Sequence, residues 1–265
     1  MQCSQRVKMN RRTDWEMYWR QRSNQPLSNF QLDRGRPPRD QKIEQLSNDE
    51  LLSFVQSRSE DTILDAGCGS GMNIERLHSK VRRIIAMDFC RDSVERARQR
   101  TQLGKMENVE VIEGNIVDIP LPDCSVDKIL CMSVLQYLSD SDVRQAFREF
   151  RRIVRPEGMV ILHVKNISSI YLSTLYLMKK IKSMFRGGVI VEYYRSYGWY
   201  FRELQSAGFK VTDYNSFNIL MFERMPKRLG QCLEKYELSN YNSWLLRKDF
   251  VRRHGADLKI KAQLV

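Results

Sequence analysis

A glycine-rich turn that directly follows a short apolar strand is the feature that most constrains this fold. The stretch Thr62-Ile-Leu-Asp-Ala-Gly67-Cys-Gly69-Ser-Gly71 runs from β-branched and apolar residues straight into three alternate glycines. Glycine is needed where the backbone takes positive φ or where a ligand lies against it, and exposed N–H groups at a helix start favour carboxylate or phosphate. The turn therefore predicts a strand-turn-helix unit that binds a ligand.

The rest of the chain alternates short β-branched runs with helical stretches, which is typical of a parallel sheet wrapped by helices. We predict seven strands, at Thr62–Asp65, Arg83–Asp88, Val109–Glu113, Asp127–Met132, Met159–Lys165, Lys210–Tyr214 and Ala256–Ala262. The predicted helices lie near Asn73–His78, Arg91–Gln102, Asp142–Ile153 and Trp199–Ala207. We expect Ser141 to be an N-cap and Pro156-Glu-Gly158 to break the chain before the fifth strand. The fold class is thus α/β, with a Rossmann-like, mostly parallel sheet and helices on both faces.

The chain is expected to divide into a helical lead-in and one α/β domain. Residues 1–60 carry aromatic residues, amphipathic stretches and a Pro- and Arg-rich loop at Arg34–Arg39, which favours a lid. Residues 61–265 are expected to form the domain, with insertions at about 167–198 and 222–250.

Cysteine usage and hydropathy exclude several classes of protein. The six cysteines are scattered, with no Cys-x-x-Cys pair and no partnering histidine cluster, so neither a disulfide framework nor a metal site is expected. Met1–Arg12 lacks the apolar core of a signal peptide, and the apolar run at Asn166–Met178 is shorter than the ~20 residues that span a bilayer. We therefore expect a cytoplasmic protein.

A second acid strengthens the ligand-binding interpretation. Asp88 ends the second predicted strand, 23 residues after Asp65. A carboxylate at about this spacing can accept both ribose hydroxyls of a nucleoside. The dinucleotide-binding pattern Gly-x-Gly-x-x-Gly is not met, because Met72 or Ile74 stands where its last glycine would be, and no Gly-Lys-Ser/Thr phosphate loop is present. A nucleoside-containing cofactor other than NAD is implied.

These motifs together resemble those of class I S-adenosylmethionine-dependent methyltransferases. The resemblance rests on Asp65-Ala-Gly-Cys-Gly-Ser-Gly71, Asp88, the stretch Glu113-Gly-Asn-Ile-Val-Asp-Ile-Pro-Leu-Pro122 and Val126-Asp127. It covers roughly Thr62 to Phe209 and is strongest to the branch of the ubiquinone/menaquinone-biosynthesis methyltransferases, methyltransferase domain 11. It implies S-adenosyl-L-methionine as the cofactor and S-adenosyl-L-homocysteine as its product.

The resemblance also implies roles for individual residues around the cofactor. The backbone of Gly67, Gly69 and Ser70 would face its methionine part, with Asp65 holding the amino group. Asp88 would bind the ribose hydroxyls. The remaining predicted contacts are Phe89 on the adenine face, Asn115 and the Ile116 amide at the adenine edge, and the Cys131 and Met132 backbone at the amino group.

Some of these residues also have a purely structural interpretation. The family usually has Asp where this chain has Asn115, which supplies an acceptor but no charge and could simply begin a turn. Cys68 and Cys131 are interpreted as small buried residues, since an activated thiol needs a neighbour that lowers its pKa.

The acceptor side is less constrained by the sequence. In-line transfer from a sulfonium depends mainly on positioning and desolvation, so a base is required mainly for a hydroxyl or carbon acceptor. Gln136 stands where the family often has a histidine, which weakens the case for proton abstraction there. Gln136 or Tyr137 is expected only to orient the acceptor. We interpret His163 as a core or supporting residue in preference to a base.

The insertion Ile167–Arg186 is amphipathic at helical spacing and basic at its C-terminal end. It is interpreted first as a helix that covers the pocket, and secondly as an interfacial helix in peripheral contact with a membrane. The aromatic stretch Tyr193–Phe201 that follows is a candidate wall for the acceptor site, although aromatic residues at this density are also ordinary core.

The sequence therefore predicts a methyltransferase acting on a small organic or lipid-like acceptor, with O-methylation expected first. The alternatives are an RNA or protein methyltransferase and a non-catalytic partner protein that binds the cofactor. The net charge of +12 favours nucleic acid, but many of the arginines fall on the two helices Arg91–Gln102 and Asp142–Ile153, which should face solvent. We therefore expect no nucleic-acid partner; the oligomeric state and the acceptor stay open.

Overall fold

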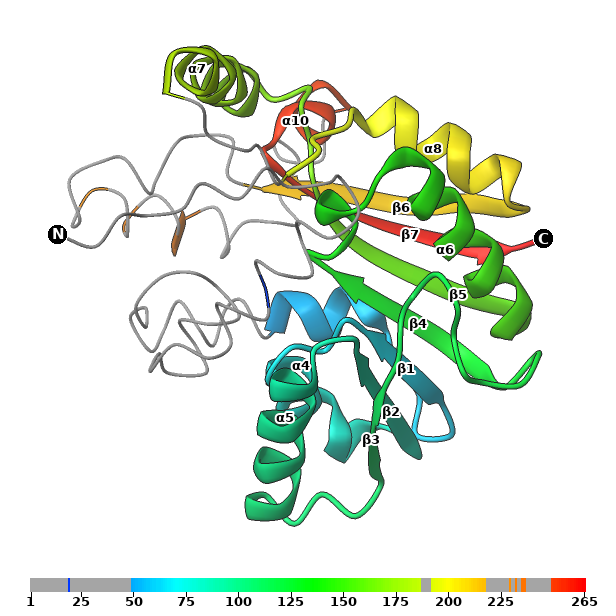
Figure 1. The fold of residues 1–265 in the computed structure, drawn as a ribbon. Coiled ribbons are helices and arrows are strands. Elements are labelled where there is room, and N and C mark those ends of the chain that lie inside the picture. The colour runs from blue at the N-terminus through cyan, green and yellow to red at the C-terminus, as the bar shows by residue number, and fades with distance from the viewer. Residues whose placement is uncertain are drawn as a thin grey trace, which may run out of the picture.

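A seven-stranded mixed sheet forms the centre of the computed structural model (Figure 1). The structure describes residues 19, 49–186, 192–217, 229, 232, 235–236 and 249–265. Most of the predicted lid, and most of the predicted insertion at 222–250, therefore lie outside the described residues. The strand order is β3-β2-β1-β4-β5-β7-β6.

The strands lie close to where the sequence predicts them. They are β1 (Thr62–Ala66), β2 (Arg83–Asp88), β3 (Val109–Glu113), β4 (Val126–Met132), β5 (Val154–Lys165), β6 (Phe209–Phe217) and β7 (Asp257–Leu264). The first five pair in parallel, whereas β7 runs antiparallel to both β5 and β6. The carboxyl ends of β1 to β5 therefore share one edge, and β7 begins at that same edge. The predicted mostly parallel α/β fold is confirmed.

Helices cover both faces of this sheet. The described helices include α4 (Met72–Leu77), α5 (Arg91–Leu103), α6 (Asp140–Ile153), α7 (Ile170–Arg186), α8 (Tyr197–Ser206) and α10 (Asp249–His254), with short 3-10 turns η1 (His78–Lys80) and η2 (Leu135–Tyr137). Every residue of β1 is buried, and its side chains alternate between two cores. Leu64 packs in the core that α6 and α8 close, and Ile63 packs in the core that α4, α5 and a helix over residues 49–55 close. This alternation is the period-two pattern of a strand buried on both faces.

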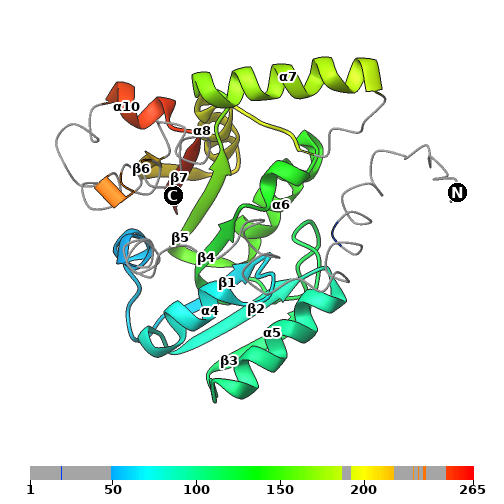
Figure 2. The same ribbon diagram turned by 90° about the vertical axis from the view of Figure 1, so that its left-hand side faces the viewer.

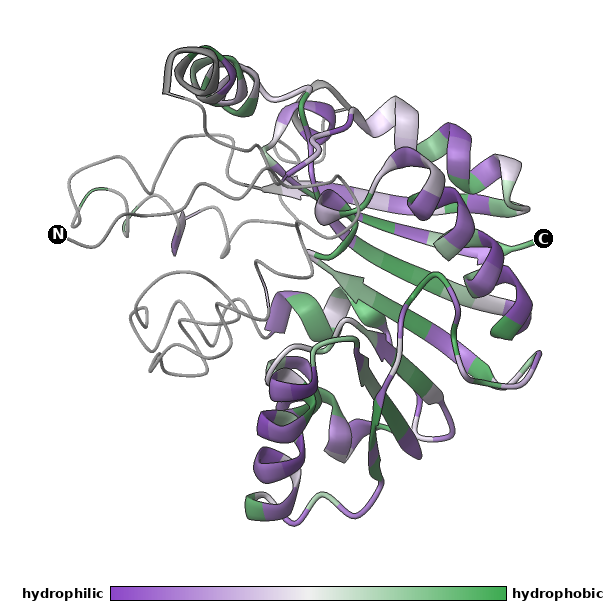
Figure 3. Cartoon of the chain, viewed as in Figure 1, coloured by the Kyte–Doolittle hydropathy of each residue, from purple (hydrophilic) through white to green (hydrophobic). Residues whose placement is uncertain are grey.

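Hydropathy follows the layers. Figure 3 shows hydrophobic residues along the central strands and hydrophilic residues over most of α5. Arg91 and Arg98 of α5 and Arg144 and Arg148 of α6 are exposed, so these positive charges lie on solvated helix surface. In the described part of the chain, no helix is both long and apolar enough to cross a bilayer.

The start of α6 corrects one sequence prediction. Ser139, and not Ser141, is the N-cap, because Ser139 has extended backbone and its Oγ accepts the N–H of Asp142 at 3.2 Å. The helix therefore starts two residues earlier than predicted, with Asp140 and Asp142 in its first turn. Both carboxylates complement the positive end of the helix dipole.

The predicted break at Pro156-Glu-Gly158 is also wrong, because β5 continues through it. Val154 pairs with Val126 and Met159 pairs with Lys128, so β5 has three more residues than β4 between the same two pairs. Glu157 takes a φ of 63° within this bulge. A proline, which has no N–H, is tolerated in such an irregularity, so the residues distort the strand without ending it.

Helix α7 lies within the predicted insertion at 167–198. Figures 1 and 2 both show it at the rim of the molecule, outside the layers of the sheet and its covering helices. Leu172, near its start, is buried, whereas Ile170, Leu177, Met178 and Ile181 are exposed.

Candidate functional site

The glycine turn has the backbone that the sequence predicts for it. Gly67, Gly69 and Gly71 have φ values of 84°, 55° and 88°. The N–H groups of Gly67 and Cys68 donate to the Met87 carbonyl at 2.8 and 3.0 Å, which joins the turn to the end of β2. A Cβ on Gly67 would lie 2.3 Å from Cγ2 of Val134. The turn therefore passes close to the loop after β4 and has no room for a side chain there.

Asp88 connects this turn to the next helix. Its Oδ2 accepts the N–H of Gly69 at 3.0 Å, and its Oδ1 accepts the N–H of Cys90 at 2.9 Å. The side chain is buried, with 8% of its surface exposed. A carboxylate is an acceptor with about four lone-pair positions, and these two bonds fix the orientation of the Asp88 side chain.

Asp65 and Ser70 are buried on either side of the first glycine, and Cys131 lies beside Asp65. Burial, with the Asp65 charge adding to it, raises the pKa of the Cys131 thiol far above neutrality. A protonated, buried thiol is neither a nucleophile nor a metal ligand. This agrees with its interpretation as a small core residue. The following residue, Met132, is half-buried at the end of β4.

Asn115 begins a turn, which is the structural interpretation that the sequence offered for it. Its Oδ1 accepts the N–H of Val117 at 3.2 Å, and its carbonyl accepts the N–H of Asp118 at 3.0 Å. Ile116 is buried in the core and Phe89 is half-buried next to Asp88. The adenine contacts of these residues stay predictions.

Gln136 lies in η2, in the loop that follows β4. Its side chain is 3% exposed, and its Oε1 has no hydrogen-bond partner among the described residues. A buried amide oxygen without a donor is costly, which suits a position that meets a ligand donor. Next to it, the Tyr137 ring packs edge-on against Trp19, with 5.2 Å between ring centroids. Trp19 belongs to the predicted lid.

Arg195 holds this loop, and the sequence interpretation missed it. Its guanidinium donates to the carbonyls of Leu135 and Leu138 at 3.0 and 2.6 Å and to Oδ1 of Asp140 at 2.7 Å. It also lies over the Trp199 ring, 4.7 Å from the centroid. Its position 55 residues after Asp140 left no local signal for these contacts.

The predicted aromatic wall divides into two parts. Tyr194 packs against Tyr176 of α7, with 5.4 Å between ring centroids, and its hydroxyl donates to Glu192 at 2.6 Å. Burial, followed by the Glu192 interaction, raises the pKa of Tyr194 well above its usual range. Tyr200, on α8, is fully buried in the core, so it is not part of a wall.

His163 lies near the end of β5, opposite Met132 of β4. Its Nδ1 lies 2.8 Å from Ser133 Oγ, and its Nε2 lies 3.3 Å from Oδ1 of Asp257 at the start of β7. Lys165 donates to the same carboxylate oxygen at 2.5 Å. Burial opposes ionisation of Asp257, but Lys165 and then His163 hold the pKa of Asp257 far below its usual range.

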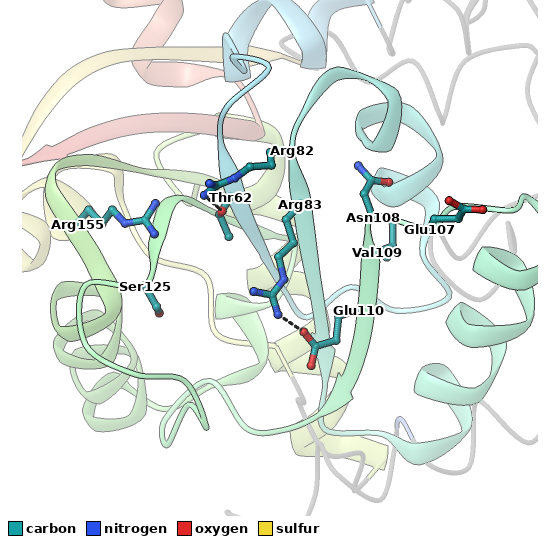
Figure 4. A pocket seen from close by; sticks show the side chains of 9 residues that line it. All are labelled: Thr62, Arg82, Arg83, Glu107, Asn108, Val109, Glu110, Ser125 and Arg155. Atoms are coloured by element: carbon teal, nitrogen blue, oxygen red, sulfur yellow. Dashed lines mark hydrogen bonds and ion pairs between the residues drawn. The ribbon is translucent and has the colours of Figure 1, made fainter.

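Most of the predicted site residues therefore lie at the carboxyl edge of the sheet, along β1, β2, β4 and β5. A separate hollow of about 460 Å³ lies at the opposite, amino edge (Figure 4). Thr62, Arg83 and Val109 line it from the starts of three strands, and Arg83 is paired there with Glu110. None of the predicted site residues lines that hollow. Among the described residues, no cluster of His, Cys, Asp and Glu could hold a metal ion.

Comparison with known proteins shows similarity to methyltransferases. Residues 64–162 match the model of a methyltransferase domain family. A probable S-adenosylmethionine-dependent methyltransferase of Mycobacterium tuberculosis is 32% identical over 104 residues, which are 39% of this chain and 35% of that protein. A malonyl-(acyl-carrier protein) O-methyltransferase of Yersinia pestis is 34% identical over 111 residues, 42% of this chain and 39% of that protein. The matches thus span less than half the length of these relatives.

A solved structure extends the likeness in fold to nearly the whole chain. Phosphoethanolamine N-methyltransferase 1 of Haemonchus contortus, in complex with phosphoethanolamine and S-adenosylhomocysteine, superposes with a TM-score of 0.66. The superposition covers 96% of this chain and 49% of that one, at 19% sequence identity. At this identity the likeness is one of fold.

Proposed function

Because residues 64–162 form a class I S-adenosylmethionine-dependent methyltransferase domain, we propose that the whole chain transfers a methyl group to a small organic or lipid-like acceptor. The observation that carries the proposal is the Asp88 carboxylate, which is tied to the Gly69 and Cys90 amides beside a turn too tight for side chains. That combination fits a nucleoside whose hydroxyls meet a fixed acid and whose tail lies against bare backbone.

The residues present fit S-adenosylmethionine and an acceptor beside it. The Gly67 turn is a cradle that a Cβ would fill, and Gln136 Oε1 is a buried acceptor without a donor in the described chain. In this proposal Asp65, Gly67, Gly69 and Ser70 hold the methionine part and Asp88 the ribose. Phe89, Asn115, Ile116, Cys131 and Met132 complete the cofactor contacts. When bound, the cofactor supplies an activated methyl group on a sulfonium, and the chain's part is to position the acceptor and exclude water.

The proposed acceptor class follows from the rim of the site. Tyr194 packs against Tyr176 of α7, and the N–H of the neighbouring Tyr193 donates to the Gln136 carbonyl at 2.6 Å, so aromatic residues lie next to the loop after β4. Such residues suit an organic or lipid-like molecule. The named relatives methylate an oxygen in one case and a nitrogen in the other. We propose O-methylation first, with Gln136 and Tyr137 orienting the acceptor.

Isotope transfer tests the proposed function. The purified protein is incubated with cell extract and methyl-labelled S-adenosylmethionine, and mass spectrometry searches the small-molecule, lipid, RNA and protein fractions for the label. The proposal predicts label in a small-molecule or lipid product. Label in RNA or protein alone would support the alternative acceptors. S-adenosylmethionine binding with no labelled product would support a non-catalytic partner.

Asp88→Asn is expected to weaken S-adenosylmethionine binding about 10- to 150-fold, because hydrogen bonds to a charged group contribute about 1.5–3 kcal/mol. Asn keeps one acceptor oxygen and nearly the same shape. Isothermal titration calorimetry measures the dissociation constant, with Asp92→Asn on the first turn of α5 as the matched control. Equal affinities for Asp88→Asn and the unaltered protein would remove the assignment of the ribose contact.

Helix α7 supports a peripheral membrane contact as part of the same proposal. Ile170, Leu177, Met178 and Ile181 are 77%, 56%, 54% and 47% exposed. At 100° per residue the first, second and last of these fall within about 40° of one another, so they form one outward stripe. The buried Leu172 lies on the other side, which means that α7 is apolar toward the protein and toward solvent. Its charged residues are all basic, which suits an anionic bilayer.

Vesicle sedimentation measures this contact. Leu177→Glu combined with Ile181→Glu is expected to reduce binding to vesicles of phosphatidylcholine and phosphatidylglycerol at least about tenfold. Two apolar side chains are lost, and the two added carboxylates are repelled by the anionic lipid. Leu103→Glu on α5, where Leu103 is 87% exposed, is the matched control and should bind as the unaltered protein does. Absence of vesicle binding by the unaltered protein, or equal binding by all variants, would contradict the contact.

A further inference from the structure

Three side chains, each at the end or start of a strand, form a continuous line at the carboxyl edge of the sheet. Ser133 follows β4, His163 belongs to β5 and Asp257 opens β7. The line runs from Ser133 Oγ to His163 Nδ1 at 2.8 Å, and from His163 Nε2 to Asp257 Oδ1 at 3.3 Å. Each ring nitrogen of His163 therefore has a polar side chain as its partner. Packing alone would not require two such partners.

The backbone of Ser133 is strained. Its φ is 62°, a left-handed conformation that is uncommon for residues other than glycine. Its N–H donates to the His163 carbonyl at 2.8 Å, which fixes the serine beside the histidine. Strained residues held in this way often lie at functional sites. Ser133 is half-buried and directly follows Met132, one of the predicted cofactor contacts.

The surrounding charges favour one tautomer of His163. Asp257 is held ionised by Lys165, so it accepts from His163 Nε2–H. Nδ1 is then the unprotonated nitrogen and accepts from the Ser133 hydroxyl. Lys259, opposite His163 on β7, is paired with Glu50, which neutralises its charge.

We propose that Ser133, His163 and Asp257 form a proton relay that deprotonates a hydroxyl acceptor, and this relay rests on the proposed function. Ser133 Oγ takes the acceptor proton as its own proton passes to His163 Nδ1, and solvent later takes that proton from the imidazolium. The acceptor oxygen uses the electron pair of its broken O–H bond to bond the methyl carbon, while the carbon–sulfur pair stays on sulfur. Ser133 is the catalytic residue, and His163 and Asp257 position and support it. The relay supplies the base that Gln136 does not.

Nitrogen NMR tests the geometry without substrate. With ¹⁵N-labelled histidine, the chain has three imidazoles, and His163→Asn assigns the relevant one. The relay predicts an unprotonated Nδ1 and a protonated Nε2 for neutral His163, and Asp257→Asn should shift the neutral ring towards the Nδ1-protonated tautomer. A neutral ring protonated on Nδ1 would overturn the relay.

Rates of label transfer test the role. Ser133→Gly removes the hydroxyl and accepts the left-handed backbone, so the fold is kept. The rate of methyl transfer is measured into the extract fraction that takes up label from S-adenosylmethionine in the experiment above. We expect this rate to fall about 100-fold or more, with cofactor affinity within about threefold of the original. Ser125→Ala, a serine near the amino edge that bonds a backbone carbonyl, should retain the full rate. Unchanged transfer by Ser133→Gly would overturn the relay alone, whereas no transfer by the unaltered protein would overturn the proposed function and the relay together.

Discussion

Arg195→Ala is expected to lower the free energy of unfolding by about 3–5 kcal/mol, because two buried carbonyls lose a charged donor, at about 1–3 kcal/mol each, and a large side chain is removed from the interior. Arg195 is 6% exposed and donates to two carbonyls and one carboxylate around the loop after β4. Its loss leaves the Leu135 and Leu138 carbonyls without these donors and leaves a cavity beneath Trp199. Because the same loop carries Gln136, we also expect methyl transfer to fall when the variant is assayed in its folded form.

Urea unfolding followed by circular dichroism measures this change. Arg202→Ala is the matched control, since Arg202 is largely exposed on α8 and its contact with Glu203 is long, at 3.6 Å. Surface pairs of this kind contribute about 0–1 kcal/mol, so the control should unfold near the original midpoint. Equal unfolding free energies for Arg195→Ala and Arg202→Ala would show that Arg195 does not hold the loop.

Gly67→Ala is expected to cost about 2–4 kcal/mol of stability and to weaken S-adenosylmethionine binding at least about 100-fold. The residue has a φ of 84°, where an L side chain costs about 1–2 kcal/mol. The added Cβ would also meet Val134 Cγ2 at 2.3 Å, so the turn or the loop after β4 must shift. Either shift moves the backbone that is proposed to face the methionine part of the cofactor.

The control for this change is Gly198→Ala, the same chemical substitution in α8. A Cβ at Gly198 has no heavy atom within 4 Å, and alanine is favoured over glycine in a helix by about 1 kcal/mol. Gly198→Ala should therefore leave stability unchanged or raise it, and should leave binding unaltered. Thermal unfolding measures the stability of the two variants, and calorimetry measures their affinity for S-adenosylmethionine. A Gly67→Ala protein with the original affinity would contradict the assignment of the turn to cofactor binding.

The elements that the sequence predicts best are those with purely local causes. The strand Arg83–Asp88 is observed with the predicted bounds because its apolar run ends at a polar residue and no competing pattern overlaps it. The strand that begins at Val154 was predicted to begin at Met159, since proline and glycine normally end a strand. Here tertiary pairing with β4 overrides that preference by forming a bulge.

The site shows the same division between local and distant causes. Asp88 and the glycine turn are adjacent to strand ends, so their meeting at one edge follows from parallel topology. Arg195 and Asp257 could not be placed in this way, because their partners lie 55 and 94 residues away, at Asp140 and His163. Their contacts depend on the order of β5, β7 and β6, which hydropathy does not encode.

A crystal structure of the protein with S-adenosylhomocysteine tests the central claim most directly. The claim is that the carboxyl edge of β1, β2 and β4 binds the cofactor. It predicts electron density for the nucleoside with both ribose hydroxyls within about 3 Å of the Asp88 carboxylate, and the homocysteine part against Gly67 and Gly69. Density in the amino-edge hollow beside Arg83 and Glu110, or a carboxyl edge left empty at saturating ligand, would contradict the claim.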